Sequence, residues 1–83
     1  MQNIKIINPK VVGESKQHIS FIGSDSSGNT IKCIAFRSVD NELGNAILNK
    51  YKNSSFQLAG YIKQSKWSNK DFFELIIEDG SIE

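Results

Sequence analysis

The sequence predicts an all-β domain with one short helix, and three observations lead to this prediction. The chain has 83 residues, which is enough for one domain only. Apolar and polar residues alternate over several short segments, as is typical of strands that bury one face. One segment near the middle instead repeats its apolar residues at helical spacing.

Composition narrows the class of protein. Hydrophobic residues make up 39% of the chain, too many for a disordered segment. No apolar run is long enough to cross a membrane, and the amino-terminal MQNIKIINPK lacks the apolar core of a secretion signal. Cys33 is the single cysteine, which excludes an internal disulfide and a cysteine cluster for zinc. We therefore expect a cytoplasmic protein with no membrane partner and no small-molecule substrate.

Charge is unevenly distributed along the chain, although the net charge is only +1. Residues 71–83 carry five acidic residues and no basic one, whereas residues 1–70 carry all ten basic residues and four acidic ones. Two interpretations are open. The split is either ordinary solvated surface or a basic face with an acidic edge, which would fit a polyanion.

Three strands are expected before the helix. The first runs from Ile4 to about Gly13, and Pro9 within it predicts an edge position, a bend or a bulge. The second covers residues 16–23 and the third residues 30 to about 37. The polar turn cluster at 24–29 joins these two into a β-hairpin.

The helix is expected to follow Asp40, whose carboxylate can cap free backbone N–H groups. Its apolar face consists of residues at helical spacing, namely Leu43, Ala46, Ile47 and Tyr51. The polar residues 53–55 end it. A fourth strand is expected at 56–64 and a fifth at 71–78, with a polar loop over residues 64–70 between them.

This order of three strands, a helix and two strands indicates a barrel. An open five-stranded sheet of this length would leave its edges exposed, and closure removes them. The helix would cover one end of the barrel. We therefore predict that residues 1–83 form a single five-stranded OB-fold barrel, a partly open Greek-key arrangement. An SH3-like barrel is the nearest competitor, but it seldom carries a helix of this length at that place.

Several segments resemble the C-terminal OB domain of the RecJ family, in matching order and over about residues 11–79. The resembling segments are VVGE at 11–14, HISF at 18–21, IKCIAF at 31–36, LAGYI at 58–62, WSNK at 67–70 and ELIIED at 74–79. There are departures from the family pattern: residues 64–66 stand where the family often has Asn, Asn69 replaces a frequent Gly, and Glu74 replaces the usual Gln.

The resemblance implies that the chain is a fragment of a bacterial hydrolase, an exonuclease that degrades single-stranded DNA from 5′ to 3′ in DNA repair and recombination. The chain alone would be no enzyme and would need no cofactor. The family's Asp-His-His chemistry, with Mg²⁺ or Mn²⁺, would lie in an absent catalytic core. Single-stranded DNA and that core would be the partners. The alternative is a protein-docking module that makes no direct contact with DNA.

Binding a single strand requires cations for the phosphates and flat aromatic faces for the bases. OB folds provide these on the face of strands two and three and in the loops between strands one and two and between strands four and five. The candidate contacts at these places are Lys16, His18, Lys32, Arg37, Lys63, Lys66, Trp67 and Lys70. Packing over the barrel mouth is an equal alternative for Trp67. Structural or solvated roles are the alternatives for the others, and no metal site is expected.

The remaining special residues are expected to be structural. Phe21, Phe56 and Phe73 are predicted to be in the core. Phe36 and Phe72 oppose the predicted core faces, and we favour their recruitment into the small core over exposure as stacking platforms. By alternation Cys33 is a buried, unreactive thiol. Asp25 is interpreted as a turn former.

Overall fold

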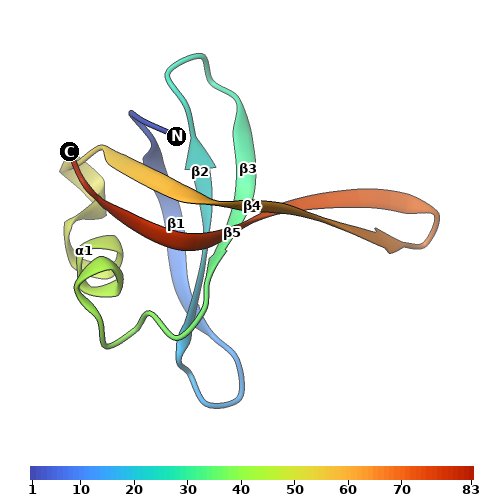
Figure 1. Cartoon of the computed structure of the whole chain (residues 1–83), viewed down its shortest axis with the longest axis horizontal. Coiled ribbons are helices and arrows are strands. Elements are labelled where there is room, and N and C mark those ends of the chain that lie inside the picture. Colours follow the sequence, from blue (N-terminus) through green and yellow to red (C-terminus); the bar gives the residue numbers. More distant parts are fainter.

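The computed structural model describes the backbone of residues 1–83 and the side chains of all of them except Trp67. The elements, in chain order, are β1 (Lys5–Val12), β2 (His18–Ser24), β3 (Thr30–Ala35), α1 (Glu42–Lys50), the 3-10 turn η1 (Tyr51–Asn53), β4 (Phe56–Trp67) and β5 (Lys70–Ile82) (Figure 1). The predicted order of three strands, a helix and two strands is confirmed. In the described part of the chain, no helix is long and apolar enough to cross a membrane.

The five strands form one sheet in the order β1-β2-β3-β5-β4. All neighbours are antiparallel except β3 and β5, which are parallel. The residues before β1 return to β4, at the other end of this order. Ile4 and Phe56 exchange two backbone hydrogen bonds of 2.9 and 2.8 Å, and the Leu58 N–H donates to the Met1 carbonyl at 2.8 Å. These contacts bring the two ends of the strand order together, and the predicted OB-like fold is confirmed.

β1 contains the irregularity predicted at Pro9. Its pairing with β2 passes from Ile7 opposite Ile22 to Lys10 opposite Ser20, so one extra residue is accommodated in β1. Asn8 adopts a positive φ of 49° at this point. Such a bulge bends a strand locally and changes which of its side chains face the core. Here it places both Ile7 and Lys10 on the outer side of the sheet.

The helix begins one residue later than predicted. Asn41 is its N-cap, and the Asn41 Oδ1 accepts a hydrogen bond of 2.8 Å from the Gly44 N–H. The prediction of Asp40 is therefore wrong. Either residue can cap a helix, so tertiary packing decides between them. Gly44 lies against the Ser38 carbonyl so closely that a Cβ there would be 1.4 Å from the oxygen.

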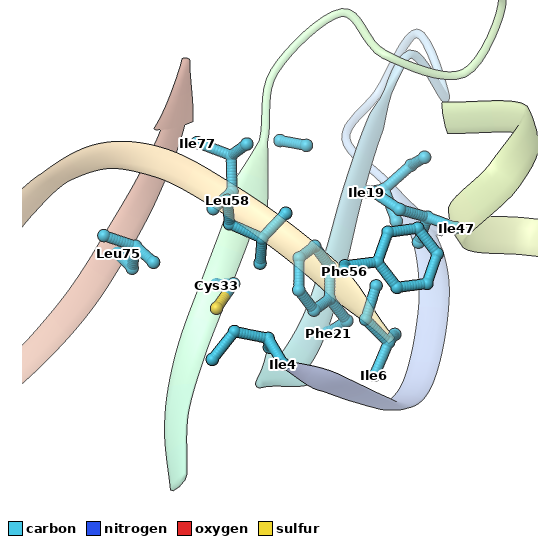
Figure 2. Packing of buried hydrophobic residues seen from close by; sticks show 11 residues of the cluster. Ile4, Ile6, Ile19, Phe21, Cys33, Ile47, Phe56, Leu58, Leu75 and Ile77 are labelled. Carbon is cyan, nitrogen blue, oxygen red and sulfur yellow. The ribbon is translucent and has the colours of Figure 1, made fainter. Parts of the chain in front are cut away.

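The core lies between the inner face of the sheet and α1. Its largest fully buried side chains are Phe21, Phe56, Ile19, Ile47 and Cys33. Figure 2 shows Ile47 of α1 directed toward Phe56 and Ile19. The predictions of a core position for Phe21 and Phe56 and of a buried Cys33 thiol are confirmed.

β4 and β5 continue past the barrel as a two-stranded ribbon, here called the arm and defined as residues 61–73. It extends to the right in Figure 1, away from α1 and both termini. The polar loop predicted at 64–70 is wrong, because strand pairing continues from Gln64 opposite Phe73 to Trp67 opposite Lys70. Only Ser68 and Asn69 turn the chain, with φ of 51° and 63°. Turns of two positive-φ residues match the twist of a hairpin.

The arm explains why the prediction of a core position for Phe73 is wrong. The barrel covers the inward face of β5 only as far as Leu75. Phe73, two residues earlier in the chain and on the same face, lies in the arm and is 52% exposed. Phe72 is exposed as well, although burial was favoured from the sequence. Alternation correctly separates the two faces of β5, but it cannot show where the barrel stops covering them.

Candidate nucleic-acid interface

The side of the sheet that points away from the core is here called the outer face. Paired residues of neighbouring strands point to the same side, so the register defines its rows. One row consists of Ile7, Ile22, Lys32, Glu74 and Lys63, and the next of Lys10, Ser20, Ile34, Ile76 and Tyr61. His18 and Phe36 lie beyond the second row. Residues from all five strands thus meet on one surface.

This outer face mixes apolar and cationic side chains. Tyr61 of β4 is 53% exposed, and the half-buried Ile34 and Ile22 lie two and three strands away from it, on β3 and β2. Ile76 is only 5% exposed, although it points outward, because it lies between Ile34 and Tyr61 in the register. A sheet surface on which lysines lie among exposed and half-buried apolar side chains has the two components that bases and phosphates require.

Glu74 lies between two lysines of the outer face. It is opposite Lys32 of β3 and Lys63 of β4. The Lys32 Nζ is 3.7 Å from the Glu74 Oε2, with the lysine side chain mostly in solvent. Exposed ion pairs contribute about 0–1 kcal/mol. Lys32 can therefore exchange this partner for a phosphate at little cost.

The end of β3 carries the second group of predicted contacts. The His18 Nδ1 accepts a hydrogen bond of 2.9 Å from the backbone N–H of Arg37. The His18 ring meets Phe36 edge-on, with ring centroids 5.1 Å apart and an interplanar angle of 74°. Phe36 is exposed, so our preference for its burial is wrong. β3 ends at Ala35, and the chain turns at Arg37, whose φ is +53°, before Phe36 can be covered.

The other predicted cations are spread more widely. The second strand begins at His18 rather than at residue 16, so Lys16 lies in the turn before it, with φ of 55°. Lys63 and Lys70 occupy the same face of the arm by alternation, whereas Lys66, opposite Asp71, occupies the other. The structure therefore brings Lys32 and Lys63 together and places Lys66 apart from them. The side chain of Trp67 is outside the described part of the chain, and its stacking stays a prediction.

Sequence reasoning missed two residues of this surface. Tyr61 alternates with the core positions of β4, which was a usable signal for an outward aromatic residue. Lys10 gave no such signal, because its side of β1 depends on the bulge at Asn8. Only the register shows that Lys10 and Tyr61 belong to one row.

Cys33 and Asp25 lie away from the outer face and have structural roles. Among the described residues, no three His, Cys, Asp or Glu side chains gather into a group that could hold a metal ion. Burial raises the pKa of the Cys33 thiol to about 11. Asp25 is confirmed as a turn former. Its Oδ1 accepts from the Ser27 and Asn29 N–H groups at 2.9 Å each, and hydrogen bonds, first that from the Asn29 side chain, lower its pKa.

A comparison with known families places this surface in context. A family model described as the RecJ OB domain matches residues 1–79. The chain belongs to the RecJ OB domain family. The resemblance noted in the sequence is thereby confirmed, and the family describes a non-catalytic domain. No curated protein and no solved structure matches the chain.

The segments that resemble RecJ lie on the candidate interface of this RecJ OB domain. VVGE and HISF form the end of β1, the turn and the start of β2, while IKCIAF is β3 with Phe36 at its end. Gly13 of the first segment has φ of +95°, and a Cβ there would lie 2.8 Å from the His18 Cδ2. The glycine thus makes room for the histidine ring. Asn69, which stands for a frequent Gly, occupies a positive-φ turn position that Asn tolerates.

Proposed function

We propose that this RecJ OB domain binds single-stranded DNA along its outer face, as the accessory domain of a RecJ-like exonuclease acting in DNA repair and recombination. One observation carries the proposal. The register assembles Tyr61, half-buried isoleucines and three lysines, Lys10, Lys32 and Lys63, on one sheet surface. Bases would stack on Tyr61 and the isoleucines while the lysines contact phosphates, so binding would not depend on the base sequence.

The proposed parent protein supplies the chemistry that this domain lacks. An upstream nuclease core with an Asp-His-His motif and Mg²⁺ or Mn²⁺ would cut the strand that the OB domain holds. We infer a bacterial, cytoplasmic hydrolase. Family membership supports this inference, because the matched model describes one domain of RecJ.

Titration of a fluorescent oligothymidylate at low salt tests the proposal. We expect a dissociation constant of about 10⁻⁴–10⁻⁶ M at physiological salt and tighter binding at low salt, with a log–log slope of about −0.7 for each phosphate neutralised. Lys63→Gln should weaken binding and lower the magnitude of the slope. Lys52→Gln is the matched control, since Lys52 is an exposed lysine of η1, away from the outer face. Binding that ignores salt, or equal losses in both variants, would contradict the proposal.

A second candidate function is docking onto the nuclease core, and the opposite face of the arm favours it. Ile62 and Phe73 are exposed there, on the continuation of the inner sheet face. That face also carries one lysine and one aspartate opposite each other, Lys66 and Asp71, so it has no net charge to attract DNA. We propose the nuclease core of the parent exonuclease as the occupant.

Two variants separate these functions. Ile62→Ser with Phe73→Ser should weaken association with a purified nuclease core and leave oligonucleotide binding unchanged. Tyr61→Ser with Lys63→Gln should do the reverse. Loss of DNA binding in the first pair would show that both faces of the arm hold nucleic acid and would exclude a separate docking face.

A further inference from the structure

We propose that His18 is a positioning residue, which holds the end of β3 in the shape that a single strand requires and does not itself contact the DNA. This inference rests on the proposed function. Its structural basis is a set of contacts between residues 13–18 and residues 36–39, here called the latch. In Figure 1 the turn between β1 and β2 and the connection from β3 to α1 lie at the same end of the barrel.

The first contact of the latch is the hydrogen bond from the Arg37 N–H to the His18 Nδ1, at 2.9 Å. β3 ends at Ala35, so the sheet offers this N–H no regular ladder partner. Arg37 also adopts a left-handed φ of +53°, which costs free energy for a residue with a side chain. The His18 Nδ1, from β2, stabilises the Arg37 backbone in this conformation. It thereby fixes the position from which the Arg37 side chain extends.

The second contact is between rings. His18 meets Phe36 edge-on at 5.1 Å between centroids, a favourable arrangement for two aromatic rings. Gly13 packs against the Cδ2 side of the histidine ring. A Cβ at residue 13 would lie only 2.8 Å from the His18 Cδ2, so the space admits only glycine. The imidazole is therefore confined, and it supports the exposed Phe36 from one side.

The third contact comes from the residue before the histidine. The Gln17 carbonyl accepts hydrogen bonds from the Ser38 and Val39 N–H groups at 3.0 and 3.4 Å. Three successive N–H groups, those of residues 37–39, thus bind residues 17 and 18. Two acceptor atoms serve these three N–H groups: the Gln17 carbonyl oxygen, which accepts twice, and the His18 Nδ1, which is the side-chain acceptor of the pair.

The latch requires one state of the imidazole. A ring nitrogen that accepts a hydrogen bond carries no proton, so the neutral ring has its proton on Nε2. Phosphate contact through Nδ1 would require that nitrogen to donate a hydrogen bond, which its acceptor role toward Arg37 excludes. The geometry therefore assigns Nδ1 to the protein backbone and leaves Nε2–H as the one other donor of the ring. In our proposal Arg37 contacts phosphate and Phe36 stacks on a base, whereas affinity lost without a change in Arg37 exchange would reveal a contact from Nε2.

Three substitutions separate the hydrogen bond to Arg37 from the ring contact with Phe36. His18→Asn places an amide oxygen near the position of Nδ1 and keeps an acceptor for Arg37. His18→Phe keeps a ring for Phe36 and removes the acceptor, and His18→Ala removes both. Circular dichroism confirms folding, and amide hydrogen exchange of Arg37, followed by NMR, reports on the latch without DNA.

We expect the Arg37 amide to exchange about threefold to tenfold faster in His18→Ala and His18→Phe, the effect of one lost backbone hydrogen bond. His18→Asn should restore most of the protection. Oligonucleotide affinity should follow the same order, and His18→Ala should lose less affinity in an Arg37→Gln background. The imidazole ¹⁵N spectrum of the unaltered protein should show the tautomer with its proton on Nε2.

Different outcomes overturn different statements. Unchanged Arg37 exchange in all variants, or a proton on Nδ1 in the unaltered protein, shows that the latch is wrong whatever the protein binds. Faster exchange with equal affinity overturns the positioning role and leaves the proposed function intact. Affinity lost equally in all three variants without a change in Arg37 exchange means that His18 contacts DNA directly. No DNA binding by the unaltered protein overturns the proposed function, and with it the role in binding.

Discussion

β4 and β5 run through both the barrel and the arm, yet the two regions place identical residue types in opposite environments. Phe56 at the start of β4 is fully buried beneath α1, while Phe73 of β5, just beyond the base of the arm, is 52% exposed. Both belong to strands with regular alternation. The difference comes from what lies over each face. In the barrel, α1 and the other strands cover the inner side, whereas in the described part of the chain the arm pairs with no third strand beyond Glu74.

The comparison teaches where stability and binding reside. Apolar area removed from water stabilises the barrel, at about 25 cal/mol per Å², and an exposed phenylalanine contributes little of this. Exposed aromatic residues on a projecting ribbon are instead available to a partner. We therefore expect substitutions in the barrel core to change the free energy of unfolding and substitutions of exposed arm residues to change binding.

The largest effect is expected from the matched pair Phe56→Ala and Phe73→Ala. The first leaves a cavity in the core and should lower the free energy of unfolding by about 3–5 kcal/mol. The second should change it by about 0.5 kcal/mol or less, as for other surface positions. Urea denaturation followed by circular dichroism measures both. Similar losses in the two variants would show that the arm is packed as tightly as the barrel.

Gly60 tests the boundary between the two regions. It lies at the bulge where β4 leaves the barrel, and a Cβ there would be 1.8 Å from the Ile76 carbonyl oxygen. Because backbone must move to accept a methyl group, Gly60→Ala should destabilise the protein by about 1–3 kcal/mol. Ala59→Gly, one residue away on the exposed side, is a useful neighbour for comparison in the same denaturation experiment. A neutral Gly60→Ala would mean that the arm can pivot freely at its base.

The arm should dominate binding. Tyr61→Ala removes an exposed ring from the outer face and should cost about 1–3 kcal/mol of single-strand binding, with little change in the unfolding midpoint. Trp67→Ala should be included in the same titration, because the sequence makes Trp67 a candidate for stacking on a base. Phe73→Ala on the opposite face is the control and should bind as the unaltered domain does. Equal losses for Tyr61→Ala and Phe73→Ala would remove the distinction between the two faces.

Cys33 gives the stability of the barrel a dependence on pH. Burial raises the pKa of its thiol from 9.0 to about 11. Since the unfolded chain loses this proton first, the stabilisation that comes from keeping the thiol neutral is complete below pH 9 and is lost as the pH rises toward 11. Urea midpoints of the unaltered protein and of Cys33→Ala, measured between pH 8 and 11, should converge. A constant difference over this range would contradict the prediction.

A small effect on stability is also expected from Glu74→Gln, at the base of the arm. Loss of the exposed Lys32–Glu74 pair should change the free energy of unfolding by less than about 1 kcal/mol. Binding should nevertheless strengthen, because the substitution removes a negative charge between Lys32 and Lys63 and frees Lys32 for phosphate. Oligonucleotide titrations at two salt concentrations check this. Weaker binding by Glu74→Gln would show that the carboxylate holds Lys32 in a productive position.

Local patterns were sufficient for the architecture. The bulge at Pro9, the hairpin around Asp25, the helix face with Ile47 and the buried Cys33 all follow from side-chain type and spacing over a few residues. The strand order follows from the number and sequence of elements, because few arrangements of five strands and one helix cover their edges. The RecJ resemblance was readable for the same reason, since its segments lie on continuous strands.

Contacts between distant residues decided the rest. Alternation assigns Phe72 and Phe73 to opposite faces but does not show that the barrel ends at Leu75. Asp40 and Asn41 are both suitable caps, and the approach of Gly44 to Ser38 selects the second. His18 looks like a surface contact in the sequence, and only its position opposite Arg37, 19 residues away, shows that Nδ1 is already occupied. Side-chain patterns specify which way a residue points, whereas coverage by other elements, which depends on long-range packing, specifies whether that direction leads to the core, to solvent or to a partner.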